Sequence, residues 1–234
     1  MALTLAQFEA RVSAKLVDAS NLVYALATID EALRTALHEY SDRLPLATDT
    51  VIVCPAASRE QNLNSLTGLL QVSEVWFPFD STADEQWPPY RVQGFELIWD
   101  DGQPVLRLSD RLGDQPQIDD EIRVWYTKRQ TIQNLDSEAA TTVLPDHETL
   151  LVTGAAGFAL QSYAIDIANS ITPNRRSSES FAKSGDKLVA DFRAQLLKLP
   201  QRQPAGPPFG PSWSMDKWDR RGGESDLFRD MPRT

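Results

Sequence analysis

The segment over residues 141–168, TTVLPDHETLLVTGAAGFALQSYAIDIA, has the apolar spacing of a helix but is crowded with very small residues at its centre. A glycine inside a helix costs roughly 1 kcal/mol relative to alanine. Small residues let another backbone approach closely, so we expect a tight packing seam with the first or second helix, or with the same helix of another subunit. The seam residues are Gly154, Ala155, Gly157 and Ala159.

Three further segments have helical patterns. Thr4 and Gln7 have the form of a capping box before a helix over about 4–18, and Thr28 and Glu31 repeat that form before a helix that ends near Arg43. The stretch over 19–27 leaves two alternatives open, separate helices or one nearly continuous helix. After the small-residue helix, expected over 146–169, a fourth helix is expected to be capped by Asn174 or Ser177. Its apolar face consists of Phe181, Leu188, Phe192, Leu196 and Leu199.

Between these helices the period changes to that of extended chain. Short β-branched or aromatic runs occur at 50–53, 74–79, 95–99, 105–108 and 121–127. The Asp101-Gly102 pair separates two of these runs and is typical of a tight hairpin. The sequence therefore predicts a small antiparallel β unit.

The last thirty-five residues have a different composition. They are rich in proline and glycine, which does not favour a core of their own. Two alternatives remain, a disordered terminus or an arm that lies extended on a neighbouring surface. For the second, we expect the aromatic side chains to act as anchors. These are Phe209, Trp213, Trp218 and Phe228.

Together these patterns predict an α+β protein in three parts. A four-helix body comes from residues 1–47 and 133–199, the inserted antiparallel β unit covers 48–132, and the extended C-terminal arm covers 200–234. No apolar run reaches the roughly 18 residues of a membrane span, and the N-terminus lacks the pattern of a secretory signal. We therefore expect no membrane association.

The net charge of −10 disfavours a general nucleic-acid binder, because phosphate affinity comes mostly from clustered Lys and Arg. The same charge suits a surface that DNA must pass without binding. A single cysteine, Cys54, excludes an internal disulfide framework, and its apolar surroundings predict a buried thiol.

Catalytic and metal-binding patterns are weak. His38 is expected at the surface, and His147 lies between Asp146 and Glu148 at a helix start without the spacing of a zinc site. Neither a nucleophile motif nor a nucleotide-binding loop occurs, because the glycines at 154 and 157 lie inside a helical pattern. We predict no enzymatic activity, no metal and no cofactor.

One alternative is a carbohydrate-binding module built on the β unit. Carboxylate pairs at 100–101 and 119–120 could serve a glycosidase, although both pairs are typical of turns. Aromatic side chains could line a sugar platform, although core and interface packing is commoner. The aromatic residues concerned are Trp76, Phe77, Phe79, Trp87 and Trp99.

Two stretches of the chain resemble a known family. TLAQFEARVSAKLVDASNLVYALATIDEALRTALHEYSDRLP resembles the opening of tailed-bacteriophage head-tail adaptor (connector) proteins, with "ARV…L.D" followed by "IDEALR.AL.EYS" and a proline. IRVWYTKRQTIQNLDSEAATTVLPDHETLLVTGAAGFAL resembles the strand, the "T-T-apolar-P" turn and the "GA" helix of phage neck proteins. The resemblance covers about residues 4–44 and 121–198. The β insertion is larger than in the minimal all-helical adaptors.

The resemblance implies a structural role. Such proteins form a ring, a dodecamer in the family, below the portal at the capsid vertex, where they extend the DNA channel and join capsid to tail. It implies contacts with the portal protein, with tail or neck proteins and with copies of the same chain, and a location in the virion neck after synthesis in the host cytoplasm. Family members carry a C-terminal segment that docks on the portal or a neighbouring subunit. Another virion component, such as a tail terminator or a minor capsid protein, remains a further alternative.

Overall fold

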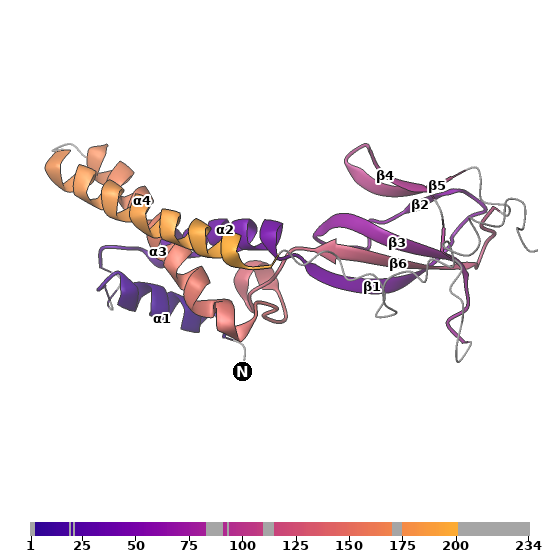
Figure 1. Cartoon of the computed structure of the whole chain (residues 1–234), viewed down its shortest axis with the longest axis horizontal. Helices are drawn as coiled ribbons and strands as arrows, with labels where there is room; N and C mark the ends of the chain where they lie inside the picture. The colour runs from indigo at the N-terminus through magenta and orange to yellow at the C-terminus, as the bar shows by residue number, and fades with distance from the viewer. Residues whose placement is uncertain are drawn as a thin grey trace, which may run out of the picture. The chain divides into compact units, whose positions relative to one another are not determined.

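The computed structural model describes residues 3–18, 20, 22–82, 91–92, 94–109, 115–169 and 175–200. The expected α+β class is confirmed: in the described residues, two helices precede six strands in the sequence and two helices follow them (Figure 1). The four proposed arm anchors, together with Trp87 and Asn174, lie outside the described residues.

The first two helices are separate. α1 covers Leu5–Lys15, and the Thr4 backbone N–H donates to Gln7 Oε1 at 2.9 Å, which confirms the first capping box. α2 covers Leu26–Arg43 and begins after Ala25, so the capping box expected at Thr28 is wrong. The loop before α2 explains the earlier start, because the Asp18 carboxylate accepts three backbone N–H groups there and fixes the approaching chain.

The second pair of helices follows the β unit. Short 3-10 turns at Leu135–Ser137 and Pro145–His147 lead into α3, Glu148–Ala168, and α4 covers Arg175–Lys198. Ser177 lies inside α4 and is therefore not its cap. By length and composition the segment Pro145–Ala168 could cross a membrane, yet 56% of its most apolar window is buried, as in the core helix of a soluble protein.

One hydrophobic core joins the four helices. α3 packs between α4 and the pair α1 and α2, and it supplies buried side chains along most of its length (Figure 1). Residues that follow the last strand, which ends at Lys128, also belong to this core, among them Ile132 and Leu135. The largest side chains that are fully buried in it are Phe8, Ile29, Leu33, Tyr40, Ile132, Leu151 and Phe192.

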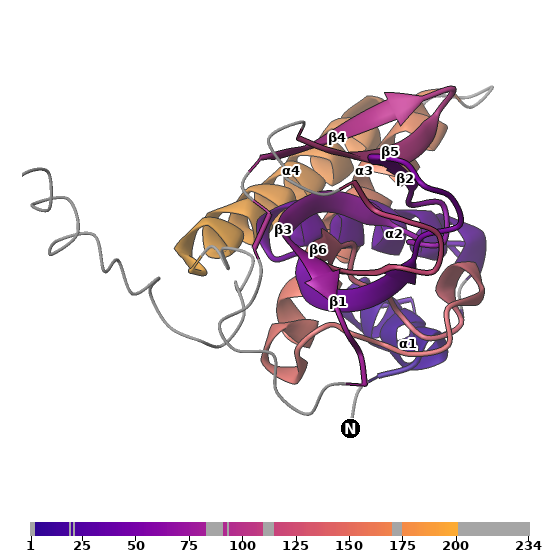
Figure 2. The same ribbon diagram turned by 90° about the vertical axis from the view of Figure 1, so that its right-hand side faces the viewer.

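The β unit contains two antiparallel sheets of three strands (Figure 2). One sheet has the order β1 (Leu46–Val53), β6 (Glu121–Lys128), β3 (Leu69–Phe79). The other has the order β2 (Glu60–Asn62), β5 (Gln103–Leu108), β4 (Phe95–Asp100). Buried residues of both sheets form a second hydrophobic cluster, which includes Leu63, Val75, Leu106, Ile122 and Val124.

The hairpin predicted at Asp101-Gly102 is confirmed. β4 and β5 pair up to Asp100 and Gln103, and both turn residues have positive φ, +47° at Asp101 and +75° at Gly102. A two-residue hairpin turn of this hand matches the twist of the strands, and it favours Asp-Gly because both positions lie in the left-handed region.

The chain enters and leaves the β unit at one place. Leu46 and Lys128 are paired residues of β1 and β6. Just beyond them, the Gln130 side-chain amide donates to the Leu44 carbonyl at 2.8 Å, and the Gln130 backbone N–H donates to Ser41 Oγ at 3.0 Å. The segment before β1 and the segment after β6 are therefore hydrogen-bonded to each other, in addition to the pairing of the two strands.

Candidate functional site

The small-residue seam lies between α3 and α4. A Cβ added at Gly154 would be 2.9 Å from the Phe192 ring, and one added at Gly157 would be 2.8 Å from Val189 Cγ2. On the opposite helix, a Cβ added at Gly185 would be 2.9 Å from the Gly157 carbonyl oxygen. Real Cβ atoms do not make such contacts, so the two backbones approach as closely as glycine allows.

The partner of the seam glycines differs from the expectation. We expected the first or second helix, or the same helix of another subunit, but the glycines meet α4. The reason is Gly185, which gives α4 a matching gap. Ala155 and Ala159, the two seam alanines, are fully buried. The seam is thus part of the hydrophobic core of the helices.

The opposite side of α3 contacts α1 through polar groups. Arg11 Nη1 lies 3.0 Å from Glu148 Oε2, and Lys15 Nζ donates to Thr153 Oγ1 at 2.7 Å. Glu148 is nearly buried, so its ion pair fixes the start of α3 against α1. These charges stabilise the body.

The two histidines have no catalytic geometry. His38 is exposed, as expected, and its Nε2 lies 3.4 Å from Arg129 Nη1. His147 Nδ1 lies 2.7 Å from the hydroxyl of Tyr40, a fully buried side chain. Within the described ranges, no group of three or more His, Cys, Asp or Glu side chains could hold a metal ion.

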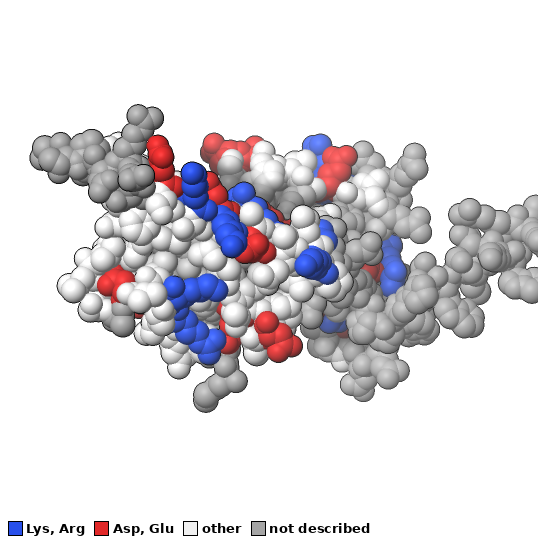
Figure 3. Space-filling view, turned by 60° about the vertical axis from the view of Figure 1, so that its left-hand side comes forward, with Lys and Arg blue, Asp and Glu red and all other residues white. Residues whose placement is uncertain are grey.

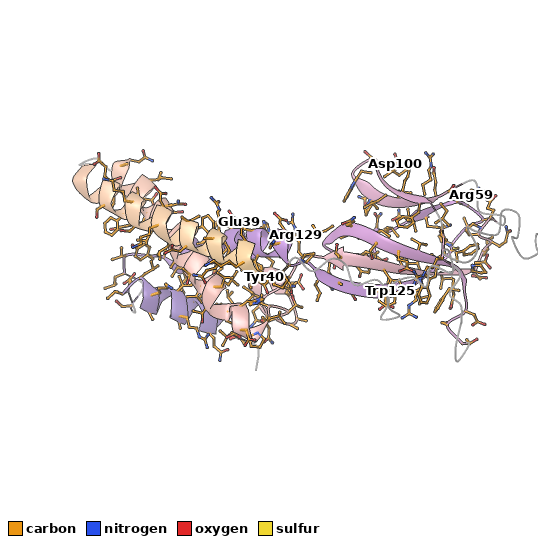
Figure 4. All side chains as sticks on the ribbon, viewed as in Figure 1. Glu39, Tyr40, Arg59, Asp100, Trp125 and Arg129 are labelled. Carbon is orange, nitrogen blue, oxygen red and sulfur yellow. The ribbon has the colours of Figure 1, made fainter. Side chains whose placement is uncertain are left out.

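Cys54 and the carboxylate pairs have structural surroundings. Cys54 is fully buried, and burial together with the nearby Asp120 charge raises the pKa of its thiol to about 11. Asp100, labelled in Figure 4, is the last residue of β4, and Asp101 follows it in the β4–β5 turn. Asp119 has a φ of +67°, and the Asp120 carboxylate accepts the Gln117 backbone N–H at 2.7 Å. Both pairs occupy turns, as the sequence indicated.

The aromatic residues of the β unit are mostly engaged with each other or with arginine. The Arg123 guanidinium lies 5.4 Å from the Trp76 ring centroid, 5.3 Å from that of Phe79 and 5.0 Å from that of Trp125. Phe77 belongs to the β core, and Trp99 is 61% exposed on β4. Among the described residues, these side chains therefore do not form an open sugar platform.

We call the group of Arg123, Trp76, Phe79 and Trp125 the arginine stack. The Arg123 guanidinium also pairs with Asp49 of β1 at 2.7 Å, and the Trp76 indole N–H donates to Glu74 at 2.7 Å. The stack joins β3 and β6 on the face opposite to Ile122 and Val124, and the ion pair with Asp49 connects it to β1. The alternation in EIRVWYT predicted a half-buried strand but not this cation–aromatic contact.

The loop between α1 and α2 is built around Asp18. Its carboxylate accepts the backbone N–H groups of Leu22, Val23 and Tyr24 at 2.9 to 3.1 Å. These backbone hydrogen bonds, that of Tyr24 first, lower the pKa of Asp18. Val17 has a φ of +60° and is 91% exposed, and Leu22 is 86% exposed. Val17 and Leu22 thus present aliphatic side chains to solvent on either side of Asp18.

β1 forms an open edge of its sheet. Among the described residues it pairs only with β6, and it includes no Lys, Arg or Pro. Its Val51 and Val53 side chains are 37% and 53% exposed. Charged residues and proline are the usual protection of edge strands against pairing with another chain. β1 is therefore available as a template for an added strand.

The negative charge is concentrated in the β unit. Residues 46–128 hold six Lys or Arg against fourteen Asp or Glu, whereas the remaining residues up to 199 hold eleven against fourteen. On the face drawn in Figure 3, acidic and basic groups alternate with wide uncharged areas. The β unit therefore carries the stronger electrostatic repulsion towards an anionic polymer.

No protein-family model matches the sequence, and no curated protein matches it either. Among solved structures, a chain from the neck of an empty gene transfer agent (GTA) particle computed with C6 symmetry has 18% identity. It matches over 67% of the present chain and 77% of its own length, with a TM-score of 0.30. A chain from the virion of a native GTA particle has 14% identity over 78% and 88% of the two chains, with a TM-score of 0.31.

A third chain, from the neck of a native GTA particle computed with C12 symmetry, has 15% identity over 79% of the present chain and 93% of its own, with a TM-score of 0.27. GTA particles are phage-like. At TM-scores between 0.27 and 0.31, these superpositions do not establish a common fold.

Proposed function

We propose that this protein is a structural component of a phage-like virion, a head-tail adaptor that forms a ring below the portal. In that position it extends the DNA channel and joins capsid to tail. Its partners are the portal protein, neck or tail proteins and further copies of the chain. Its place is the virion neck.

One observation carries this proposal. The two stretches that resemble phage adaptors, 4–44 and 121–198, are separated by most of the β unit in the sequence, yet their helices share one hydrophobic core. Phe8 and Leu33 from the first stretch and Leu151 and Phe192 from the second are all fully buried in it. A chance resemblance of two separate sequences would not require them to fold as one body.

The charge distribution supports the same role. A ring around a DNA channel must not bind the passing duplex, and the acidic β unit would repel phosphates. The engaged aromatic residues and the turn positions of the carboxylate pairs provide no support for the carbohydrate-binding alternative.

The test is assembly with a portal protein. The purified chain should form closed rings in electron micrographs, either alone or on portal from the same genome, and should remain on the portal through density-gradient sedimentation. Deletion of residues 200–234 should leave the helical body folded and weaken this association, because the arm supplies the anchors Trp213 and Trp218. A matched variant with Arg220 and Arg221 changed to alanine should associate more strongly than one lacking both tryptophans, since buried aromatic anchors outweigh rim charges.

Two outcomes would contradict the proposal. One is a chain that stays monomeric and sediments apart from portal at all concentrations. The other is incorporation into a different part of the virion, which would favour a tail terminator or minor capsid protein. Glycan binding that depends on Trp99 would support the carbohydrate-binding alternative instead.

A further inference from the structure

The solvent-facing side of α4 is basic, although the chain as a whole is acidic. α4 holds six Lys or Arg against three Asp or Glu, whereas the chain has a net charge of −10. The buried side of the helix contains Gly185, Val189, Phe192 and Leu196. Opposite that side, at helical spacing, a row of exposed residues follows the helix axis. We call this row the α4 face; it consists of Lys183, Lys187, Ala190, Ala194 and Lys198.

The three lysines of the α4 face belong to none of the ion pairs found among the described residues. Arg193, on the flank of the helix, is by contrast bonded to Glu39 at 2.9 Å. Asp191 lies at the margin of the α4 face and lowers its charge by one. Ala190 and Ala194 have short side chains, so a flat surface can approach the helix closely between the lysines.

β4 has the opposite charge on the face that points away from the β core. Glu96 and Asp100 are exposed there, and neither belongs to an ion pair among the described residues. Arg107 lies opposite Glu96 on β5, but it is already paired with a carboxylate of β2 at 2.7 Å. Between the two carboxylates, Ile98 is half-buried beside its partner Val105. We call Glu96, Ile98, Asp100 and Val105 the β4 face.

The two faces match in length as well as in charge. Lys187 and Lys198 are separated by eleven residues of helix, or about 16 Å along its axis. Glu96 and Asp100 are separated by four residues of strand, or about 13 Å. Lysine side chains are long enough to bridge the difference. A helix laid along the strand would therefore place its cations at the two carboxylates and its alanines over Ile98.

A second copy of the chain is the partner that this match favours. α4 belongs to the helical unit and β4 to the β unit, so every subunit carries both faces (Figure 1). Two α4 faces would bring lysines together, and two β4 faces would bring carboxylates together, so contacts between like faces are disfavoured. The favoured contact joins unlike faces of two subunits, which is the type of contact that a closed cyclic ring requires.

We propose, on the basis of the ring assembly proposed above, that the α4 face of one subunit docks on the β4 face of its neighbour. Lys187 and Lys198 pair with the carboxylates of Glu96 and Asp100. Exposed ion pairs contribute little stability by themselves, so their role is to select the partner and the orientation. The alanines pack on Ile98 and exclude water from the middle of the contact.

Charge reversal in full-length chains tests this contact. One variant carries Lys187→Glu and Lys198→Glu, and the other carries Glu96→Lys and Asp100→Lys. Each variant alone opposes like charges, so its assembly, alone or on the portal, should be weaker by about tenfold or more in sedimentation experiments. An equimolar mixture opposes unlike charges at every contact when the two variants alternate. Assembly of the mixture should therefore recover to nearly that of the unmodified chain.

The matched control carries Glu138→Lys and Asp166→Lys. These exposed carboxylates belong to neither face, and the control changes the net charge by the same amount as the variant of β4. It should assemble like the unmodified chain. Equal weakening by the control would overturn the contact, because it would assign the effect to net charge. Failure of the mixture to assemble, with both variants melting like the unmodified chain, would also overturn it.

Salt provides a second measurement that needs no variant. Assembly of the unmodified chain should weaken as the salt concentration rises from about 0.05 to about 0.5 M, because exposed charges are then screened. Assembly that is independent of salt would overturn the contact. Ring formation, scored separately in micrographs, tests the adaptor function. Rings that persist in both charge-reversal variants contradict only the contact, whereas open filaments of the mixture, without rings, contradict only the ring.

Discussion

The helical unit and the β unit close their cores in different ways. In the helical unit, two glycines of α3 and one of α4 bring backbones into direct contact, and most of α3 is buried. In the β unit, the sheet that contains β6 buries one face and covers part of the other with the arginine stack. The contact between α3 and α4 tolerates almost no added volume. The arginine stack relies on the Arg123 side chain, which is about 30% exposed.

The largest effect is expected from Phe192→Ala in the helical unit. Phe192 is fully buried and its ring contacts the Gly154 position directly, so the change creates a cavity in the seam. A loss of roughly 3–5 kcal/mol in the free energy of unfolding is expected. Denaturant unfolding measures it, with Leu197→Ala, 71% exposed on the same helix, as the control. Similar losses for both variants would mean that the seam is not the tight part of the fold.

Gly157→Leu is expected to be nearly as damaging for the opposite reason. The new side chain would collide with Val189 and Leu188, including the Val189 backbone nitrogen at 3.0 Å from the added Cβ. Overpacking of this kind typically costs about 1–3 kcal/mol. Gly102→Ala is the comparison in the β unit, where the added Cβ has no atom within 4 Å and only the positive φ is unfavourable. An unchanged melting temperature for Gly157→Leu would contradict the close approach of α3 and α4.

In the β unit, Arg123→Lys keeps the charge opposite Asp49 but removes the planar group that lies over three aromatic rings. Cation–aromatic contacts contribute about 0.5–2 kcal/mol, and lysine does not replace arginine at a stacked site. A loss of about 1 kcal/mol is therefore expected from chemical denaturation. Arg107→Lys, at an exposed pair with Glu60, is the matched control and should change stability little. Equal losses would assign the stabilisation to ion pairing alone.

The smallest effect is expected from Glu9→Gln, and its sign is a gain. Burial, together with the neighbouring Asp30 carboxyl, raises the pKa of Glu9, so its ionised form is disfavoured in the folded state. At neutral pH the glutamine variant should melt slightly higher than the unmodified chain. The gap should close as the pH falls below the ordinary value of 4.5, where Glu9 is neutral in both states. A lower melting temperature at neutral pH would mean that the carboxylate of Glu9 is stabilising.

Much of the fold could be predicted because its signals are local. Apolar spacing located four helices, and Asp101-Gly102 located a hairpin. β2 was missed, since its three residues, Glu60 to Asn62, are polar and too short to show alternation. The second helix start was also missed, because Asp18 fixes the chain from several residues away. Contacts between residues that are distant in the sequence produce no periodic pattern in it.

The candidate surfaces were harder to predict for the same reason. The small residues of α3 predicted the close approach of another backbone, but only the three-dimensional structure identifies Gly185 of α4 as the facing residue. Arg123 lies in an ordinary alternating strand, and its three aromatic neighbours come from β3 and β6. The open edge of β1 depends on strand order, which the sequence does not state. The roles of Trp213 and Trp218 as anchors remain predictions.

The pairing of Leu46, where the chain enters the β unit, with Lys128, where the chain leaves it, has an evolutionary consequence. Directly paired residues of neighbouring antiparallel strands are about 5 Å apart, so the β unit enters and leaves the helical unit through a gap that a short turn could bridge. Domain insertions are tolerated where chain ends lie this close. A lineage could therefore acquire, lose or exchange residues 46–128 as one inserted segment, while the helical core stays unchanged.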